Sequence, residues 1–177
     1  MQNKQIEVLG KKYSKPISCL TAYSPAVANI LDGLVDMILV GDSLGSTLYG
    51  MNNTQKVTLD MMKTHGEAVF KNVNKSIGVI DMPFGTYKNN KQAFKNAKYL
   101  ISCTQAKFVK LEILIEKDVS IIRHLSDKNI KVIAHIGVTP QSYKDFSKIK
   151  VVGRNKMQVN KLVSLAKKLE DIGCSTV

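Results

Sequence analysis

Short apolar runs alternate along this chain with longer segments in which apolar residues recur every three or four positions. Short apolar runs are typical of buried strands, whereas the wider spacing is typical of helices with one buried face. The pattern predicts strands at residues 16–22, 36–42, 76–82, 107–113 and 130–137. It predicts helices at residues 25–34, after an N-cap at Thr58, and at 88–102, 116–129 and 156–172, with a sixth strand beginning at Cys174.

This order of elements predicts an α/β fold with a parallel sheet. When a helix follows each strand, the chain returns through that helix and the next strand pairs in parallel with the first. The helices then cover the sheet. The run at residues 36–42 is too apolar to have one face in water. Both a doubly wound open sheet and a (β/α)₈ barrel fit this alternation. We find no Gly/Ser-rich linker or break in composition, so we expect a single domain over residues 1–177.

Composition places the chain among ordinary globular proteins, with 44% hydrophobic residues. No apolar run is long enough for a membrane span, and the N-terminus has no apolar export signal, so we expect a cytoplasmic location. Cys19, Cys103 and Cys174 are widely spaced within or beside apolar segments. This spacing favours small buried side chains over a disulfide framework or a cysteine metal site.

The net charge of +12 raises the possibility of a nucleic-acid partner. The distribution of charge argues against it, because Arg123 and Arg154 are the only arginines and the lysines are scattered along the chain. No block of like charge or basic stripe with interleaved aromatics is present. We therefore expect no nucleic-acid partner.

Polar side chains follow the predicted strands at the end where α/β proteins bind ligands. The second strand ends at Asp42 and Ser43, and the third ends at Asp81. In the fourth strand, Lys110 and Glu112 are two positions apart and so point to the same face. The fifth strand ends at His135.

Three carboxylates, from Asp42, Asp81 and Glu112, therefore come from the same ends of successive strands. Buried carboxylates are costly unless they pair or bind a metal, and hard oxygen ligands suit Mg²⁺. The alternative is that Asp42 and Asp81 are helix caps or loop anchors, and that His135 is satisfied by a neighbouring backbone group. His65 and His124 fall within predicted helices, where we expect surface or packing roles.

Six short motifs in register carry a family resemblance: LTAY (20–23), ILVGDSLG (38–45), the VT that ends at Thr58, DMPFGTY (81–87), VKLE (109–112) and HIGVTPQ (135–141). Together they resemble the ketopantoate hydroxymethyltransferase family over nearly all of residues 16–177. The resemblance implies a (β/α)₈ TIM barrel. It also implies a homo-oligomer for a full-length family member.

The resemblance further implies a Mg²⁺-dependent transfer of a hydroxymethyl group from 5,10-methylenetetrahydrofolate to the α-keto acid 3-methyl-2-oxobutanoate. The metal would act as a Lewis acid and stabilise the enolate formed when the C3 proton leaves. By resemblance, the metal ligands are Asp42, Asp81 and Glu112. By the same argument, the substrate-binding residues are Asp42, Ser43, Asp81 and Lys110, with His135 as a possible pocket residue.

The family's catalytic base is a glutamate on the sixth strand, which would fall just past Val177. We therefore expect an incomplete barrel, with about five βα units and the start of strand six, truncated before its base. The sequence also departs from the family at three places. Ser24 stands where an Asp is usual, ILIEKD follows VKLE where a Gly-Gly step is usual, and KVVGR replaces a pattern with Gln before the glycine.

Two other functions fit some of these features. A related Mg²⁺-dependent barrel enzyme of the phosphoenolpyruvate mutase type would be favoured by a catalytic cysteine in a flexible loop, a place where neither Cys19 nor Cys103 is predicted to lie. An inactive fragment or a basic binding protein would be supported only by the positive charge.

Overall fold

The computed structural model describes residues 17–113, 115 and 117–177. Five strands form one sheet within the predicted ranges: β1 (Cys19–Thr21), β2 (Met37–Val40), β3 (Ile77–Asp81), β4 (Phe108–Glu112) and β5 (Val132–His135). Each strand is shorter than predicted at both ends. Residue 16 of the first predicted strand, and residues 114 and 116 of the altered loop beyond Glu112, lie outside the described residues.

The predicted helices are confirmed as α2 (Pro25–Leu31), α4 (Leu59–Phe70), α5 (Asn90–Thr104), α6 (Lys117–Asp127) and α7 (Lys156–Asp171). Thr58 caps α4 as predicted, because its hydroxyl accepts a hydrogen bond of 3.2 Å from the Met61 backbone N–H. The sequence pattern did not predict α3 (Leu44–Tyr49) or the 3₁₀ turns η2 (Thr54–Lys56), η3 (Pro140–Ser142) and η4 (Phe146–Lys148). No helix among the described residues is both long and apolar enough to cross a membrane.

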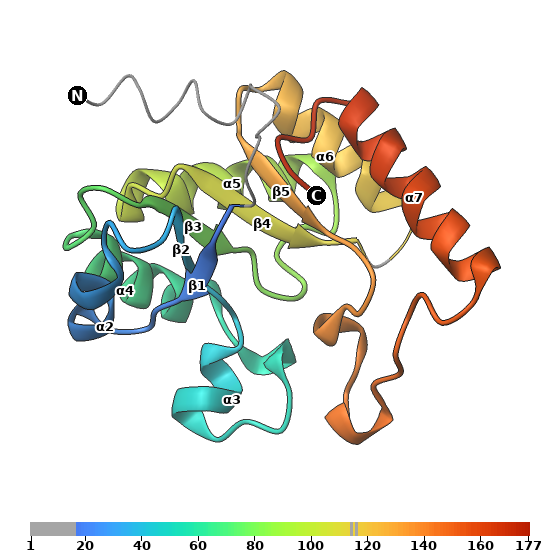
Figure 1. Ribbon diagram of the computed structural model, residues 1–177. Coiled ribbons are helices and arrows are strands. Elements are labelled where there is room, and N and C mark those ends of the chain that lie inside the picture. Colours follow the sequence, from blue (N-terminus) through green and yellow to red (C-terminus); the bar gives the residue numbers. More distant parts are fainter. Residues whose placement is uncertain (1–16, 114, 116) are drawn as a thin grey trace.

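The strands are all parallel and lie side by side in chain order, β1-β2-β3-β4-β5 (Figure 1). In a doubly wound sheet the strand order reverses near the middle, so helices cover both faces. When each new strand is added on the same side of the previous one, right-handed crossovers put every helix on one face. This order is that of a (β/α)₈ barrel. The segment after α7 continues this strand order. Thr176, in the predicted sixth strand, forms a parallel bridge with Ile133 of β5.

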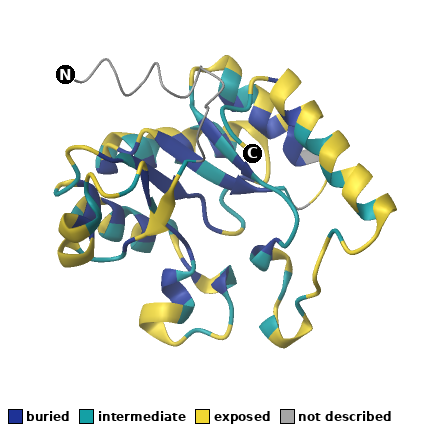
Figure 2. Ribbon diagram, in the orientation of Figure 1, coloured by how far each residue is buried: buried dark blue, intermediate teal, exposed yellow. Residues whose placement is uncertain are grey.

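The two faces of the sheet carry different apolar clusters. Ile38, Ile80, Val109 and Val132 point toward the helices and belong to the main core. The alternate residues pack into a second cluster on the opposite face, which corresponds to the inside of a barrel; its members are Met37, Val79 and Phe108, with Ile17, Leu39, Ile77 and Ile133 beside them. Figure 2 shows the central strands buried and β1 exposed.

The prediction that the cysteines are small buried side chains is wrong. Cys19 is exposed, and Cys103 and Cys174 are half-buried, all as free thiols. Cys19 lies on β1, which pairs with β2 on one side only among the described residues, so sheet neighbours cover it incompletely. Strand periodicity identified the strand correctly but could not show that it lies at the edge.

Close packing between α4 and its neighbours predicts a stability effect at Gly66. A Cβ there would lie 2.6 Å from Thr104 Cγ2 and 2.8 Å from Ile80 Cδ1. We expect Gly66→Ala to lower the free energy of unfolding by about 1–2 kcal/mol, because overpacking outweighs the better helix propensity of Ala. Urea denaturation measures the effect, with Thr64→Ala on the exposed side of α4 as control. Equal stability of the two variants would contradict the packing argument.

Candidate functional site

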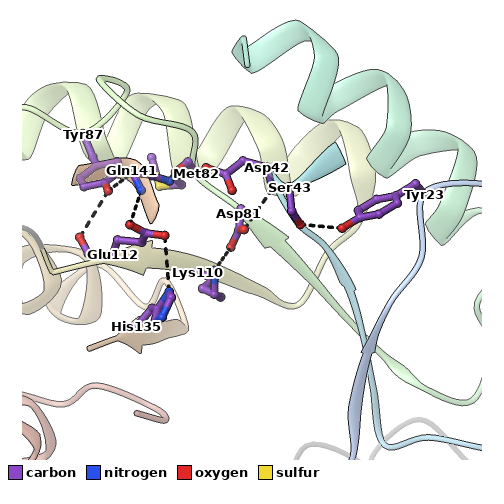
Figure 3. Close-up of polar contacts among 10 residues, drawn as sticks. All are labelled: Tyr23, Asp42, Ser43, Asp81, Met82, Tyr87, Lys110, Glu112, His135 and Gln141. Atoms are coloured by element: carbon purple, nitrogen blue, oxygen red, sulfur yellow. Dashed lines mark hydrogen bonds and ion pairs between the residues drawn. The ribbon is translucent and has the colours of Figure 1, made fainter. Parts of the chain in front are cut away.

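The predicted polar residues meet at one edge of the sheet. Asp42 follows β2, Asp81 ends β3, and Lys110 and Glu112 lie in β4, while His135 ends β5 (Figure 3). The loop with α3 and the loop after β5 project from this same end of the sheet (Figure 1). The convergence follows from the parallel register, in which Asp81 is opposite Lys110 and Glu112 is opposite His135.

A buried ion pair lies at the centre of the site. Lys110 Nζ lies 2.6 Å from Asp81 Oδ1, and the two side chains are 18% and 4% exposed. Burial is the largest single influence and acts to lower the pKa of Lys110, but the charge and hydrogen bond of Asp81, together with the charges of Asp42 and Glu112, raise the pKa overall. Lys110 therefore stays positively charged at neutral pH. The second oxygen of Asp81, Oδ2, accepts a hydrogen bond of 3.1 Å from the Asp42 backbone N–H.

The Asp42 carboxylate has a raised pKa in the folded chain. Burial, followed by the charge of Asp81, raises the pKa of Asp42 from 3.8 to about 7. A hydrogen bond from Gln141 and the charge of Lys110 act in the opposite direction. The ionised form of Asp42 is thus costly in the folded chain, as expected for a carboxylate that lacks a cation of its own.

Gln141 is a site residue to which the sequence analysis gave no role. It is 1% exposed and lies in η3, after β5. Its Nε2 donates to Asp42 Oδ2 at 2.8 Å and to the Met82 carbonyl at 3.1 Å, while its backbone N–H donates to Glu112 Oε2 at 2.9 Å. The motif HIGVTPQ ends on this residue, but sequence separation hides the contact because Asp42 lies 99 positions earlier.

Tyr87 supports Gln141 from the loop after β3. Its hydroxyl donates its one proton to Gln141 Oε1 at 2.6 Å and also lies 3.3 Å from the Glu112 carbonyl, and the side chain is 4% exposed. Burial raises the pKa of Tyr87, so its hydroxyl remains a proton donor. Gln55 Nε2 donates to the Gln141 carbonyl at 2.8 Å and ties η2 to the same cluster.

Ser43 lies at the other end of the site, where β2 passes into α3. Its Oγ is 2.6 Å from the Tyr23 hydroxyl. Tyr23 belongs to the loop after β1, and its carbonyl lies 2.9 Å from His65 Nδ1, while His65 Nε2 lies 2.9 Å from the Tyr49 hydroxyl. His65 therefore links the loop after β1 to α3 by hydrogen bonds, a structural role in keeping with the predicted surface or packing role. His124 likewise packs edge-on against Phe94, with 6.2 Å between ring centroids.

Ser24, one of the three predicted departures from the family pattern, caps a helix. Its side chain accepts a hydrogen bond of 3.4 Å from the Val27 backbone N–H at the start of α2. An Asp can make the same kind of cap, so the helix start is preserved by the substitution. The change removes one negative charge from the loop after β1.

His135 does not show the backbone hydrogen bond offered as its alternative explanation. Among the described residues, its buried Nδ1 has no hydrogen-bond partner. It lies 3.5 Å from Glu112 Oε1, which is ion-pair distance without hydrogen-bond geometry. The ring is 30% exposed, so His135 lines the site beside Glu112.

The three predicted metal ligands do not form one compact ligand group. In the described part of the chain, no three His, Cys, Asp or Glu side chains come together in a way that could hold a metal ion. Asp42 and Asp81 are neighbours, whereas Gln141 lies between Asp42 and Glu112 and bonds to both. Asp42 and Asp81 still fit Mg²⁺, because that ion is usually held by one or two protein carboxylates and keeps several waters.

The donor set has an excess of negative charge. Asp42, Asp81 and Glu112 are each at most 5% exposed, and Lys110 is the cation that pairs directly with one of them. Burial of like charges is unfavourable, and a divalent cation would offset it. Parallel strands in consecutive order, with these polar groups at their carboxyl ends, define a barrel-type α/β enzyme.

Comparison with known sequences identifies the family. The chain belongs to the ketopantoate hydroxymethyltransferase family, whose sequence profile matches residues 3–177. A protein of Pelagibacter ubique named 3-methyl-2-oxobutanoate hydroxymethyltransferase is 42% identical over 177 residues, which cover 100% of this chain and 67% of that relative. A protein of the same name from Rhizobium rhizogenes is 38% identical over 173 residues, covering 97% and 63%. The chain thus spans about two thirds of the length of these relatives.

Solved structures share the fold at low sequence identity. Oxaloacetate acetylhydrolase superposes with a TM-score of 0.70 at 12% identity, covering 97% of this chain and 60% of that one. Phosphonopyruvate hydrolase, in a complex with oxalate and Mg²⁺, has a TM-score of 0.70 at 12% identity, covering 98% and 60%. The phosphoenolpyruvate phosphomutase of Streptomyces platensis has a TM-score of 0.69 at 13% identity, covering 97% and 61%. These likenesses confirm the predicted barrel fold.

Proposed function

We propose that this chain carries the cation-binding and keto-acid-binding residues of a Mg²⁺-dependent ketopantoate hydroxymethyltransferase. The reaction transfers a hydroxymethyl group from 5,10-methylenetetrahydrofolate to 3-methyl-2-oxobutanoate and gives 2-dehydropantoate, a step of pantothenate biosynthesis. The observation that carries the proposal is the buried Asp42, Asp81 and Lys110 cluster at the carboxyl ends of β2, β3 and β4, in a chain of this family.

Each residue has a task in this proposal. Asp42 and Asp81 hold Mg²⁺, which when bound would polarise the keto group and acidify the C3 proton. Lys110, fixed by Asp81, attracts the carboxylate of the keto acid. The Ser43 hydroxyl lies at the start of α3, where it is placed to donate to a substrate oxygen. Glu112 acts on the cation through water, from the far side of Gln141.

The remaining parts of the reaction are not assigned to described residues. We assign neither the glutamate base that the family resemblance implies nor the folate cosubstrate to any described residue. Val79 of β3 and Phe108 of β4 lie two positions before Asp81 and Lys110 on the same face of the sheet, and each is 1% exposed. Such a dry environment strengthens the interactions of Lys110 and the carboxylates with a charged substrate.

A phosphoenolpyruvate-mutase-type lyase is the second candidate, and the shared barrel fold is what favours it. The identity to that enzyme is 13%, against 42% to a named hydroxymethyltransferase. A catalytic cysteine in a loop would support the mutase type, but Cys19 lies in β1 and Cys103 lies in α5. The hydroxymethyltransferase proposal therefore has the stronger support.

Binding of the keto acid to the 177-residue chain tests the proposal. We expect isothermal titration calorimetry to detect 3-methyl-2-oxobutanoate in the presence of Mg²⁺ and to lose the signal when the metal is chelated, because the cation bridges substrate and carboxylates. The control ligand is 3-methylbutanoate, which has the same carbon skeleton and carboxylate but no keto group. Equal binding of the two acids, or binding that is independent of Mg²⁺, would sink the proposal.

A further inference from the structure

Gln141 links the loops at four strand ends, and the inference drawn from it rests on the proposed function. Its side chain contacts Asp42 after β2, Met82 after β3 and Tyr87 in the next segment, while its backbone contacts Glu112 of β4. It follows β5 in the chain and is almost completely buried. A loop residue with this many partners in the site does more than close a turn.

The chemistry of its partners determines which way the Gln141 amide points. The Met82 carbonyl can only accept a hydrogen bond, so the group 3.1 Å from it must be the amide NH₂. The Tyr87 hydroxyl can then donate to the amide oxygen at 2.6 Å. A flipped amide would set its oxygen against both the Met82 carbonyl and the Asp42 carboxylate. The orientation is therefore specified by Met82 and Tyr87 and not by Asp42 alone.

This arrangement fixes Asp42 at two points. Its backbone N–H is held by Asp81, and its carboxylate oxygen Oδ2 is held by Gln141 at 2.8 Å. The carboxylate is thereby restrained in rotation, and Oδ1 is the oxygen that Gln141 does not occupy. A carboxylate that is already oriented loses less conformational entropy when it binds a cation.

The same residue sets the separation of two carboxylates. The amide of Gln141 contacts Asp42, and its backbone N–H contacts Glu112 Oε2 at 2.9 Å, so one residue spans the space between them. Gln55 holds the Gln141 carbonyl at 2.8 Å from a different loop. We propose that Gln141, oriented by Tyr87, is the positioning residue that aims Asp42 at Mg²⁺ and keeps Glu112 apart from it.

Two variants and a control test this proposal. Gln141→Met keeps the length of the side chain but removes the amide oxygen and the amide NH₂. Tyr87→Phe removes only the hydroxyl that orients the amide. Gln158→Met is the matched control, because Gln158 accepts hydrogen bonds from Gly153 and Arg154 at the start of α7, outside the site. Circular dichroism and thermal unfolding show whether each variant folds.

Mg²⁺ affinity, measured by calorimetry without substrate, is the readout that a merely structural role would not change. We expect Gln141→Met to raise the Mg²⁺ dissociation constant by roughly 10- to 100-fold, the usual effect of losing a residue that orients a metal ligand. Tyr87→Phe should raise it by a smaller factor, and Gln158→Met should leave it unchanged. A folded Gln141→Met chain with unaltered affinity overturns the proposal; if that variant does not fold, unaltered affinity in Tyr87→Phe does so.

A double-mutant cycle separates this inference from the proposed function. Absence of Mg²⁺ binding by the unmodified chain would contradict the proposed function. The thermal midpoints of Gln141→Met, Asp42→Ala and the double variant would then still decide whether Gln141 holds Asp42. We expect the change in thermal midpoint of the double variant to differ from the sum of the two single changes, and additive changes would overturn the positioning role.

Discussion

Replacing Asp42 with Asn is expected to stabilise the metal-free chain at pH 8 and to abolish its affinity for Mg²⁺. The Asn oxygen can still accept the Gln141 hydrogen bond, so the substitution removes mainly the buried charge. Because the pKa of Asp42 rises from 3.8 to about 7 on folding, ionisation of Asp42 opposes folding at high pH. We expect a gain of about 2 to 4 kcal/mol at pH 8, or roughly 5–10 °C in the thermal midpoint.

The sign of the pH dependence follows from proton binding. Between pH 3.8 and about 7 the folded chain holds the Asp42 proton more tightly than the unfolded chain does. The contribution of Asp42 to stability therefore falls as pH rises through this window, and the penalty is complete above about pH 7. Thermal unfolding from pH 5 to 8.5 should show a decline that is reduced in Asp42→Asn. The exposed Asp60→Asn is the control and should keep the original pH profile.

Two results would contradict this prediction. Asp42→Asn with the same pH profile as the original chain would show that the carboxylate is not destabilised by burial and Asp81. Asp42→Asn with unchanged Mg²⁺ affinity in calorimetry would remove Asp42 from the cation site. A stability gain together with a binding loss is what distinguishes a functional carboxylate from a loop anchor, whose loss destabilises the fold.

Replacing Lys110 with Met is expected to weaken keto-acid binding by on the order of 100-fold and to destabilise the chain by about 3 kcal/mol. The substitution leaves Asp81, which is 4% exposed, without its direct cation and close to the charge of Asp42. Removal of one member of a buried ion pair usually costs this much, because the other charge stays buried and unpaired. The keto acid also loses the positive charge that meets its carboxylate.

Lys107→Met is the matched control for Lys110→Met. Lys107 is exposed and lies just before the same strand, so its removal changes the net charge equally and leaves the site intact. Calorimetry with Mg²⁺ and 3-methyl-2-oxobutanoate, together with urea denaturation, compares the two variants. Equal keto-acid affinity in Lys110→Met and Lys107→Met would show that binding depends on overall charge and not on Lys110.

Much of the fold could be predicted because its signals are local. The apolar runs at 36–42 and 76–82 predict strands. The Thr58 cap is also local, because its hydroxyl bonds to the backbone N–H of Met61, three residues further along the chain. Alternation along a strand likewise predicts that Lys110 and Glu112 share a face, and the structure places both toward the site. The edge position of β1 could not be predicted, because exposure depends on which strands lie beside it. The exposure of Cys19 follows from that position.

The candidate site, like the fold, could be predicted from the sequence only in part. Strand ends placed Asp42, Asp81 and His135 at one edge, because parallel strands align their carboxyl ends. Gln141 and Tyr87 carried no such signal, since an amide and a phenol in loops are ordinary surface residues until the loops pack together. The separation of Glu112 from Asp42 was not predicted either, because it depends on Gln141, which bonds to both carboxylates.

The sequence by itself determined the element types, the family and the residue types available at the strand ends, because these depend on local periodicity and on motifs in register. Only the tertiary structure decided which of those groups touch. It paired Lys110 with Asp81, raised the pKa of Asp42 and inserted Gln141 between two carboxylates. The physical reason is that desolvation, charge coupling and hydrogen-bond geometry depend on distances between residues that are tens of positions apart in the chain.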